Sequence, residues 1–334
     1  MIVSGHCGQV FSGDRFRYPA QGAEFLFDLI VGATALFVFI SGFLFQRNLK
    51  EDFDYVPFLK KKAVNLLLPY GVVTAVYCLL AAASNEIHDP ASQTTPLLFL
   101  SHYSEAFLLG SVGISFWYIP FIYALFMLSP LFVRTARAPT GIALTVAAAF
   151  FLVGLFVNRP TTSYILPVQQ IAYFGPYFMA GMLCMRWRPQ FEAFVSRPST
   201  LAVSLLAAFV LAYLQMHYGQ PGNLHGEPFE PIAFDYKYLQ KLVLCIAICS
   251  ILMRFEDKRM PALDLVASYS FGIFFLHEMV IGSLLGLHGV LPDLPENTYA
   301  NLALSSAIVM GYTTVAVYAI KAVGGKRSKY LIGS

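Results

Sequence analysis

Two histidines in this sequence have neighbours that suit acid–base chemistry. His277 is followed directly by Glu278 inside the apolar segment SYSFGIFFLHEMVI, and His6 lies in SGHCG near the start of the chain. A neutral imidazole can accept a proton from an alcohol because its pKa lies near physiological pH. A carboxylate within an apolar membrane segment is costly, so it usually faces a protein interior or water. We predict these three residues as catalytic groups; the alternatives are a packed His6 and a structural hydrogen bond at His277 and Glu278.

The densest basic cluster of the chain lies in and before the segment FLKKKAVNLLLPY. It contains Lys60, Lys61 and Lys62, with Arg47 and Lys50 upstream. Clustered cations attract phosphate, so this cluster could bind a phosphate-bearing cosubstrate. Lys and Arg also accumulate in the cytoplasmic loops of membrane proteins, so the same residues could serve only as topology anchors. Under both interpretations we expect a basic connector between two apolar helices, on the cytoplasmic side.

Polar residues at the opposite ends of the apolar segments are candidates for substrate contact. Asp28 lies at the mouth of one such segment, where it could orient His6 or pair with Arg15 or Arg17. Its carboxylate could equally cap a helix. We therefore expect Asp28 and Arg15 near a substrate.

Two lysines and an aromatic pair lie at further segment ends. Lys237 and Lys241 are i,i+4 neighbours that could contact a phosphate-linked acceptor, but we favour snorkelling to lipid headgroups. Trp117 and Tyr118 open the segment WYIPFIYALFMLSPL, where membrane proteins place interfacial aromatic residues.

Composition places the chain in a membrane and excludes several function classes. The sequence is 57% hydrophobic and 12% charged, against about 25% charged residues in an ordinary soluble domain. A formal net charge of +3 is too small to indicate nucleic-acid binding. The five cysteines lie in apolar segments without metal-site spacing, so we predict no disulfide framework and no metal.

The apolar segments have the lengths of membrane spans. Crossing the hydrocarbon core takes about 20 residues, and a shorter apolar run, from Met1 to about Phe11, begins the chain. We predict an all-α, polytopic membrane protein of about ten transmembrane helices, the first apparently truncated, forming a single domain over 1–334. The other nine spans are expected at 25–46, 63–84, 115–134, 140–158, 165–186, 199–218, 236–253, 265–288 and 300–322.

The distribution of Lys and Arg predicts the orientation. Seventeen of the 22 basic residues fall in alternate loops that include the C-terminal tail, three fall in the other loops, and Lys237 and Lys241 lie at the mouth of a span. Since cytoplasmic loops carry the excess of Lys and Arg, both termini are expected in the cytoplasm. Membrane lipids are then the immediate surroundings of the chain.

Local breaks in the spans are also predicted. Prolines inside the spans indicate kinked helices; they are Pro69, Pro120, Pro130, Pro167 and Pro176. A short interfacial or re-entrant helix is expected around Leu97–Leu109, within the long connector 85–114.

Five segments in a fixed order resemble the integral-membrane acyltransferase-3 family. They are FVFISGFLF, FLKKKAVNLLLPY, FWYIPFIYALFMLSPL, YFGPYFMAGMLC and SYSFGIFFLH, and they cover nearly the whole chain. The resemblance implies ten helices and transfer of an acetyl or succinyl group from cytoplasmic acyl-coenzyme A to a sugar hydroxyl. The acceptor would be a cell-surface or lipid-linked glycan at a bacterial inner membrane.

The resemblance also implies roles for individual residues. The family's first-helix histidine matches His6, its basic pair falls on Lys62 and Asn65, its tryptophan falls on Trp117, and its ninth-span histidine falls on His277. The glutamate that follows the tryptophan in many members is absent here. The family arginine eleven residues before the first histidine would precede the first residue, which fits a start site upstream of this sequence.

The expected function is therefore membrane O-acyl transfer, with acetyl-coenzyme A as the expected cosubstrate held by Lys60, Lys61, Lys62 and Asn65. His6 would act as general base or carry the acyl group, Trp117 would line the cavity, and His277 and Glu278 would tune the site or relay protons. The alternative from a different class is a glycan or lipid transporter or flippase that uses the same kinked helices without a thioester. An inactive relative that serves as a scaffold is a third possibility.

Overall fold

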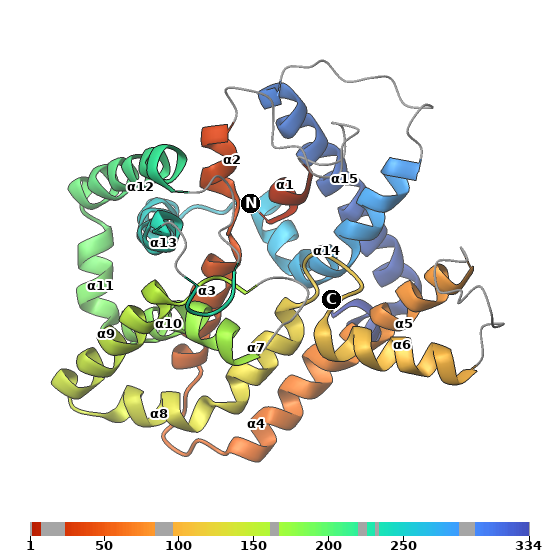
Figure 1. Cartoon of the computed structure of the whole chain (residues 1–334), viewed down its shortest axis with the longest axis horizontal. Helices are drawn as coiled ribbons and strands as arrows, with labels where there is room; N and C mark the ends of the chain where they lie inside the picture. Colours follow the sequence, from red (N-terminus) through yellow and green to blue (C-terminus); the bar gives the residue numbers. More distant parts are fainter. Residues whose placement is uncertain are drawn as a thin grey trace. The chain divides into compact units, whose positions relative to one another are not determined.

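The computed structural model describes residues 2–7, 24–83, 96–160, 167–219, 226–230, 234–286 and 298–333. Helices dominate these ranges, and no strand occurs within them (Figure 1). The all-α, polytopic prediction is confirmed. The helices are α1 (Ile2–Cys7), α2 (Glu24–Ile30), α3 (Thr34–Arg47), α4 (Tyr55–Lys62), the π-helix η1 (Ala63–Leu67), α5 (Leu68–Ala83), α6 (Pro96–Leu109), α7 (Tyr118–Met127), α8 (Ser129–Arg137), α9 (Thr140–Phe156), α10 (Pro167–Arg186), α11 (Arg188–Val195), α12 (Pro198–Tyr218), α13 (Tyr236–Met253), α14 (Pro261–Gly286), α15 (Thr298–Gly324), the 3-10 helix η2 (Gly325–Arg327) and α16 (Ser328–Ile332).

Six helical stretches in the described chain are long and apolar enough to cross a membrane, and the count rises to seven if α7 and α8 form one broken span. The six are Asp28–Arg47, Tyr55–Ala83, Pro198–Tyr218, Tyr236–Met253, Pro261–Leu284 and Leu302–Ile332. α9 is apolar but shorter than these six stretches. α10 lies within the expected span 165–186, but it is less apolar than the six stretches and is not one of them. The count of ten stays a prediction.

The described chain divides into two compact units that interleave along the sequence. Unit 1 comprises residues 1–53, 128–260 and 295–303, and unit 2 comprises residues 54–127, 261–294 and 304–334. The prediction of a single domain over 1–334 stays a prediction.

In unit 1, α3 and α10 pack with their backbones in close contact, because glycines face the opposite main chain. A Cβ on Gly42 would overlap the carbonyl group of Phe178, and a Cβ on Gly181 would overlap the carbonyl oxygen of Phe39. Small residues at helix crossings let membrane helices approach closely. Two of the recognised segments, FVFISGFLF and YFGPYFMAGMLC, therefore form one interface. α12 packs along α13 in the same unit (Figure 1).

In unit 2, Lys60, Lys61 and Lys62 lie in a helix and not in a connector as predicted. α4, η1 and α5 run continuously from Tyr55 to Ala83. Leu and Lys are good helix formers, and Pro57 falls in the first turn of α4, where a proline is tolerated. The helix therefore begins before the lysines and includes all three.

The π-helix η1 has a local cause. Pro69 follows it and cannot donate a hydrogen bond to the carbonyl group of Asn65, and its ring crowds that carbonyl. The kink predicted at Pro69 stays a prediction; the structure shows a π-helix directly before this proline, and Asn65 lies inside it.

The short helix expected around Leu97–Leu109 is observed as α6. It packs on α5 through two tyrosine hydroxyls: that of Tyr70 donates to the carbonyls of Ala106 (3.0 Å) and Phe107 (2.9 Å), and that of Tyr103 donates to the carbonyl of Gly71 (3.3 Å). These hydrogen bonds attach α6 to α5, although Ala106 is the only buried residue of α6.

Candidate active-site residues

One ring nitrogen of His277 is hydrogen-bonded to the backbone of its own helix. The side chain is fully buried on α14, and Nδ1 lies 2.7 Å from the carbonyl oxygen of Phe274 and 3.0 Å from that of Ile273. Carbonyl oxygens only accept hydrogen bonds, so Nδ1 must carry the proton. In the neutral imidazole the lone pair is then on Nε2. This tautomer suits a proton acceptor.

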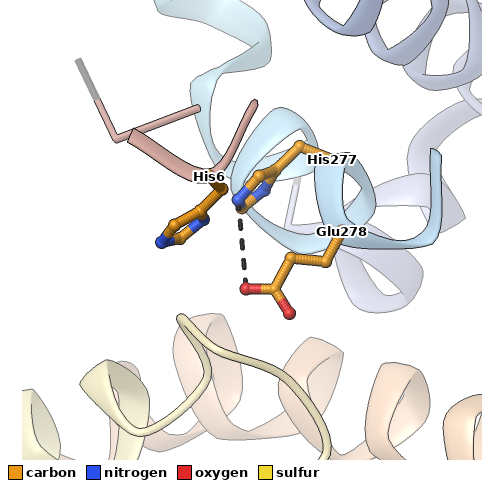
Figure 2. A group of neighbouring side chains, drawn as sticks. All are labelled: His6, His277 and Glu278. Carbon is orange, nitrogen blue, oxygen red and sulfur yellow. Dashed lines mark ion pairs between the residues drawn. The ribbon is translucent and has the colours of Figure 1, made fainter. Parts of the chain in front are cut away.

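Glu278 accepts hydrogen bonds from the segment that precedes α7. Its Oε2 accepts from the backbone N–H of Ile114 at 2.8 Å, and its Oε1 accepts from the backbone N–H of Ser115 at 2.6 Å and from the Ser115 hydroxyl. Figure 2 shows His277 and Glu278 side by side on α14, with the 4.0 Å ion pair between Nε2 and Oε1 drawn as a dashed line. That distance exceeds a hydrogen bond.

Gly110 and Gly113 allow the segment before α7 to approach Glu278 and then to turn into α7. A Cβ on Gly113 would overlap Oε2 of Glu278. Gly110 has a φ of 68°, a conformation that favours glycine, and a Cβ there would collide with the backbone of Trp117. Trp117 is half-buried and packs against Phe121, with ring centroids 5.9 Å apart.

His6 belongs to unit 1, although Figure 2 also draws it. It lies on α1 and is half-buried. α1 packs against α2, with Gly5 facing the side chain of Ile30. His6 is therefore held next to the end of α2.

Asp28 pairs with a residue that the sequence analysis did not assign to it. Its carboxylate lies 2.5 Å from Nζ of Lys237 and accepts from Nε2 of Gln240 at 3.3 Å. Nζ of Lys241 donates to the carbonyls of Asp28 and Leu29, both at 3.0 Å. Both lysines are buried, so the favoured expectation that they snorkel to lipid headgroups is wrong.

The hydrogen bonds from Lys241 satisfy backbone carbonyls at the break between α2 and α3. α2 ends at Ile30 and α3 begins at Thr34, and Gly32 between them has a φ of 85°. A break of this kind leaves helix-end carbonyls without intrahelical partners, and an ammonium group is favourable at a helix C-terminus. The ammonium group of Lys241 is the cation at the C-terminal end of α2. Asp28 lies in the last turn of α2 and is no N-cap.

A second buried polar group adjoins the N-terminus of α13. Asp235 caps that helix by accepting from the N–H of Tyr238 at 3.2 Å, and it accepts from the hydroxyl of Tyr173 at 2.6 Å. Burial raises the pKa of Asp235, while the hydrogen bond from Tyr173 and the charge of Lys237 oppose the shift. Arg159 is half-buried with its guanidinium over the ring of Phe174.

The three lysines of the basic cluster differ in environment. Lys60 and Lys61 are exposed, whereas Lys62 is half-buried with Nζ 4.5 Å from the ring centroid of Phe126 and 5.6 Å from that of Phe58. Successive helix residues point about 100° apart, which separates Lys62 from its neighbours. Asn65, in η1, is half-buried.

Some expected residues lie outside the described ranges, and some functional candidates were missed. Arg15 and Arg17 fall in 8–23, which the structure does not describe. The role of Ser115 beside Glu278 and that of Gln240 beside Asp28 were not predicted. The only sequence signal for Ser115 is its place in a Gly- and Ser-containing stretch, GSVGIS, which is followed by Phe116 and Trp117.

The described helices and their buried ionisable groups define a helical membrane protein with an imidazole held in one tautomer inside a candidate span. A family model described as an acyltransferase domain, that of the acyltransferase-3 family, matches residues 1–321, and the chain belongs to this family. Comparison with curated proteins and with solved structures finds no match. The chain is thus a membrane acyltransferase in the general sense.

Proposed function

We propose that this protein is a membrane O-acyltransferase that moves an acetyl or succinyl group from cytoplasmic acyl-coenzyme A to a hydroxyl of a cell-surface or lipid-linked glycan. The observation that carries the proposal is the family match over residues 1–321. The proposed setting is a bacterial inner membrane with both termini in the cytoplasm, supported by the distribution of Lys and Arg.

The proposed chemistry needs a base for the acceptor hydroxyl. In one route an imidazole takes the hydroxyl proton, the oxygen attacks the thioester carbonyl, the C–S bond breaks, and the departing thiolate takes the proton. In the other route the imidazole attacks the thioester first and then passes the acyl group to the hydroxyl. We assign the base or carrier role to His6, and a proton-transfer role to His277.

The tautomer of His277 supports its part in this scheme. Because Nδ1 donates to the backbone, Nε2 is the nitrogen that can accept a proton. After accepting it, the imidazolium would lie at ion-pair distance from the Glu278 carboxylate. The charge that forms on His277 is then partly balanced.

We propose that the coenzyme phosphates bind at the N-terminal end of the 55–83 helix. Lys60 and Lys61 are exposed and can contact phosphate, and Asn65 lies one turn further along in η1. Lysine supplies a point charge without the bidentate geometry of arginine. Trp117 is proposed to line the acceptor side.

The decisive experiment uses purified protein with acetyl-coenzyme A that is isotopically labelled in the acetyl group, plus glycan mass spectrometry of cells with and without the gene. We expect coenzyme A release that depends on the acceptor, and a mass difference of one acetyl or succinyl unit on the glycan. Label retained on protein without acceptor would select the acyl-carrier route. Glycan or lipid flux without coenzyme consumption would overturn the proposal in favour of a transporter.

A further inference from the structure

Glu278 is engaged by three donors from one short segment. Two are backbone N–H groups, of Ile114 and Ser115, and the third is the hydroxyl of Ser115. A carboxylate offers about four acceptor positions, so most of its capacity is used. Hydrogen bonds to a charged acceptor are the strong ones, so this contact firmly ties α14 to the 110–117 segment.

The same segment is shaped to accept this contact. Gly113 has no side chain where Oε2 of Glu278 lies, and Gly110 turns back against the backbone of Trp117. Trp117 follows Ser115 by two residues and then begins the turn into α7. A displacement of the Ser115 backbone is therefore expected to displace Trp117 as well.

A proton relay would need different geometry. Glu278 lies 4.0 Å from Nε2 of His277, beyond hydrogen-bond distance. Protonating Oε1, the oxygen that faces His277, would also set a new O–H donor against the N–H or hydroxyl of Ser115, because Oε1 already accepts two hydrogen bonds. Both points argue against a relay and favour a fixed, ionised carboxylate.

We propose that Glu278 and Ser115 form a clasp that positions Trp117 for the acceptor, so that Glu278 is a positioning residue and not a proton carrier. The role of Trp117 rests on the proposed function, whereas the clasp itself does not. The relevant variants are Glu278→Gln and Ser115→Ala, since Gln places a donor amide against the backbone N–H groups and Ala removes the hydroxyl donor.

The test uses a Trp187→Phe background, because Trp117 and Trp187 are the two tryptophans of the chain. Trp117 fluorescence then reports directly on the segment. We expect Glu278→Gln and Ser115→Ala to shift the emission to the red and to increase acrylamide quenching, while the exposed Glu105→Gln in the same unit leaves both unchanged. Gly113→Ala should act like Glu278→Gln, and Gly282→Ala, where a Cβ meets open space, should not.

Kinetics separate positioning from proton transfer. Misplacement of a substrate-positioning group costs about 10- to 100-fold in rate, so we expect both clasp variants to lose activity in that range with the shape of the pH–rate profile retained. An unchanged Trp117 emission in Glu278→Gln overturns the clasp. Loss of one limb of the pH profile in Glu278→Gln, with Ser115→Ala fully active, also overturns it. Absence of acyl transfer in the parent protein would refute the proposed function and leave the fluorescence test of the clasp intact.

Discussion

The carboxylate of Asp28 lies 2.5 Å from the ammonium nitrogen of Lys237, and both side chains are buried. The pair joins the end of α2 to the first turn of α13, beside the carbonyls that Lys241 caps. Residues far apart in the sequence thus hold the break between α2 and α3. The pair is a structural element of unit 1.

Removing one partner of this pair should destabilise the protein strongly. Lys237→Met leaves a buried carboxylate without its cation, and such losses cost about 3–5 kcal/mol. The double variant Asp28→Asn/Lys237→Met should be less damaging than the sum of the two single variants, because neither charge remains unpaired. Thermal unfolding in detergent measures the effect, with the exposed Lys326→Met as control. Additive losses would show that the two residues do not depend on each other.

The glycines at the crossing of α3 and α10 should not tolerate a methyl group. Gly42→Ala and Gly181→Ala each place a Cβ into a backbone carbonyl of the other helix, and overpacking typically costs about 1–3 kcal/mol. We expect a lowered unfolding temperature and poorer recovery of folded protein. Gly311→Ala, which meets open space in the described structure, is the matched control. Equal stability of all three variants would contradict the close packing.

Replacing the proposed base should abolish activity without unfolding the protein. His6 is half-buried on α1, so His6→Ala should lower glycan acylation by about 100-fold or more at unchanged membrane abundance. The exposed His217→Ala should behave like the parent. Acylation that survives in His6→Ala would remove this residue from the mechanism.

The lysines of α4 should separate into two functional groups. Lys60→Glu and Lys61→Glu should each raise KM for acyl-coenzyme A, by about fivefold or more, because a screened charge pair at about 4 Å is worth about 1 kcal/mol. Lys62→Met should instead lower stability, since Lys62 packs over Phe126. Kinetics at several salt concentrations measure the first effect. Cysteine accessibility at both termini checks that the topology is preserved, because charge reversal can invert a span.

The architecture of this protein was largely predictable from its sequence. Span lengths follow from the bilayer thickness and helix rise, which is why Pro198–Tyr218 and Tyr236–Met253 nearly coincide with their expected bounds. The family followed from five segments in a fixed order and was confirmed by the match over 1–321. The placement of Lys60–Lys62 in a connector was wrong, because charge alone does not end a helix and lysine is itself a good helix former.

The partners of the polar groups were not predictable. From the sequence, Asp28 could have paired with Arg15 or Arg17. The tertiary structure instead brings Lys237, at the start of α13, next to Asp28 at the end of α2. In the same way the pair His277 and Glu278 was visible as sequence neighbours, yet its hydrogen bonds go to the backbone of α14 and to Ser115. Apolar length and periodicity act within one helix, so the sequence alone determined the spans. Which buried polar groups meet depends on helices distant in the chain, and that was decided only by tertiary packing.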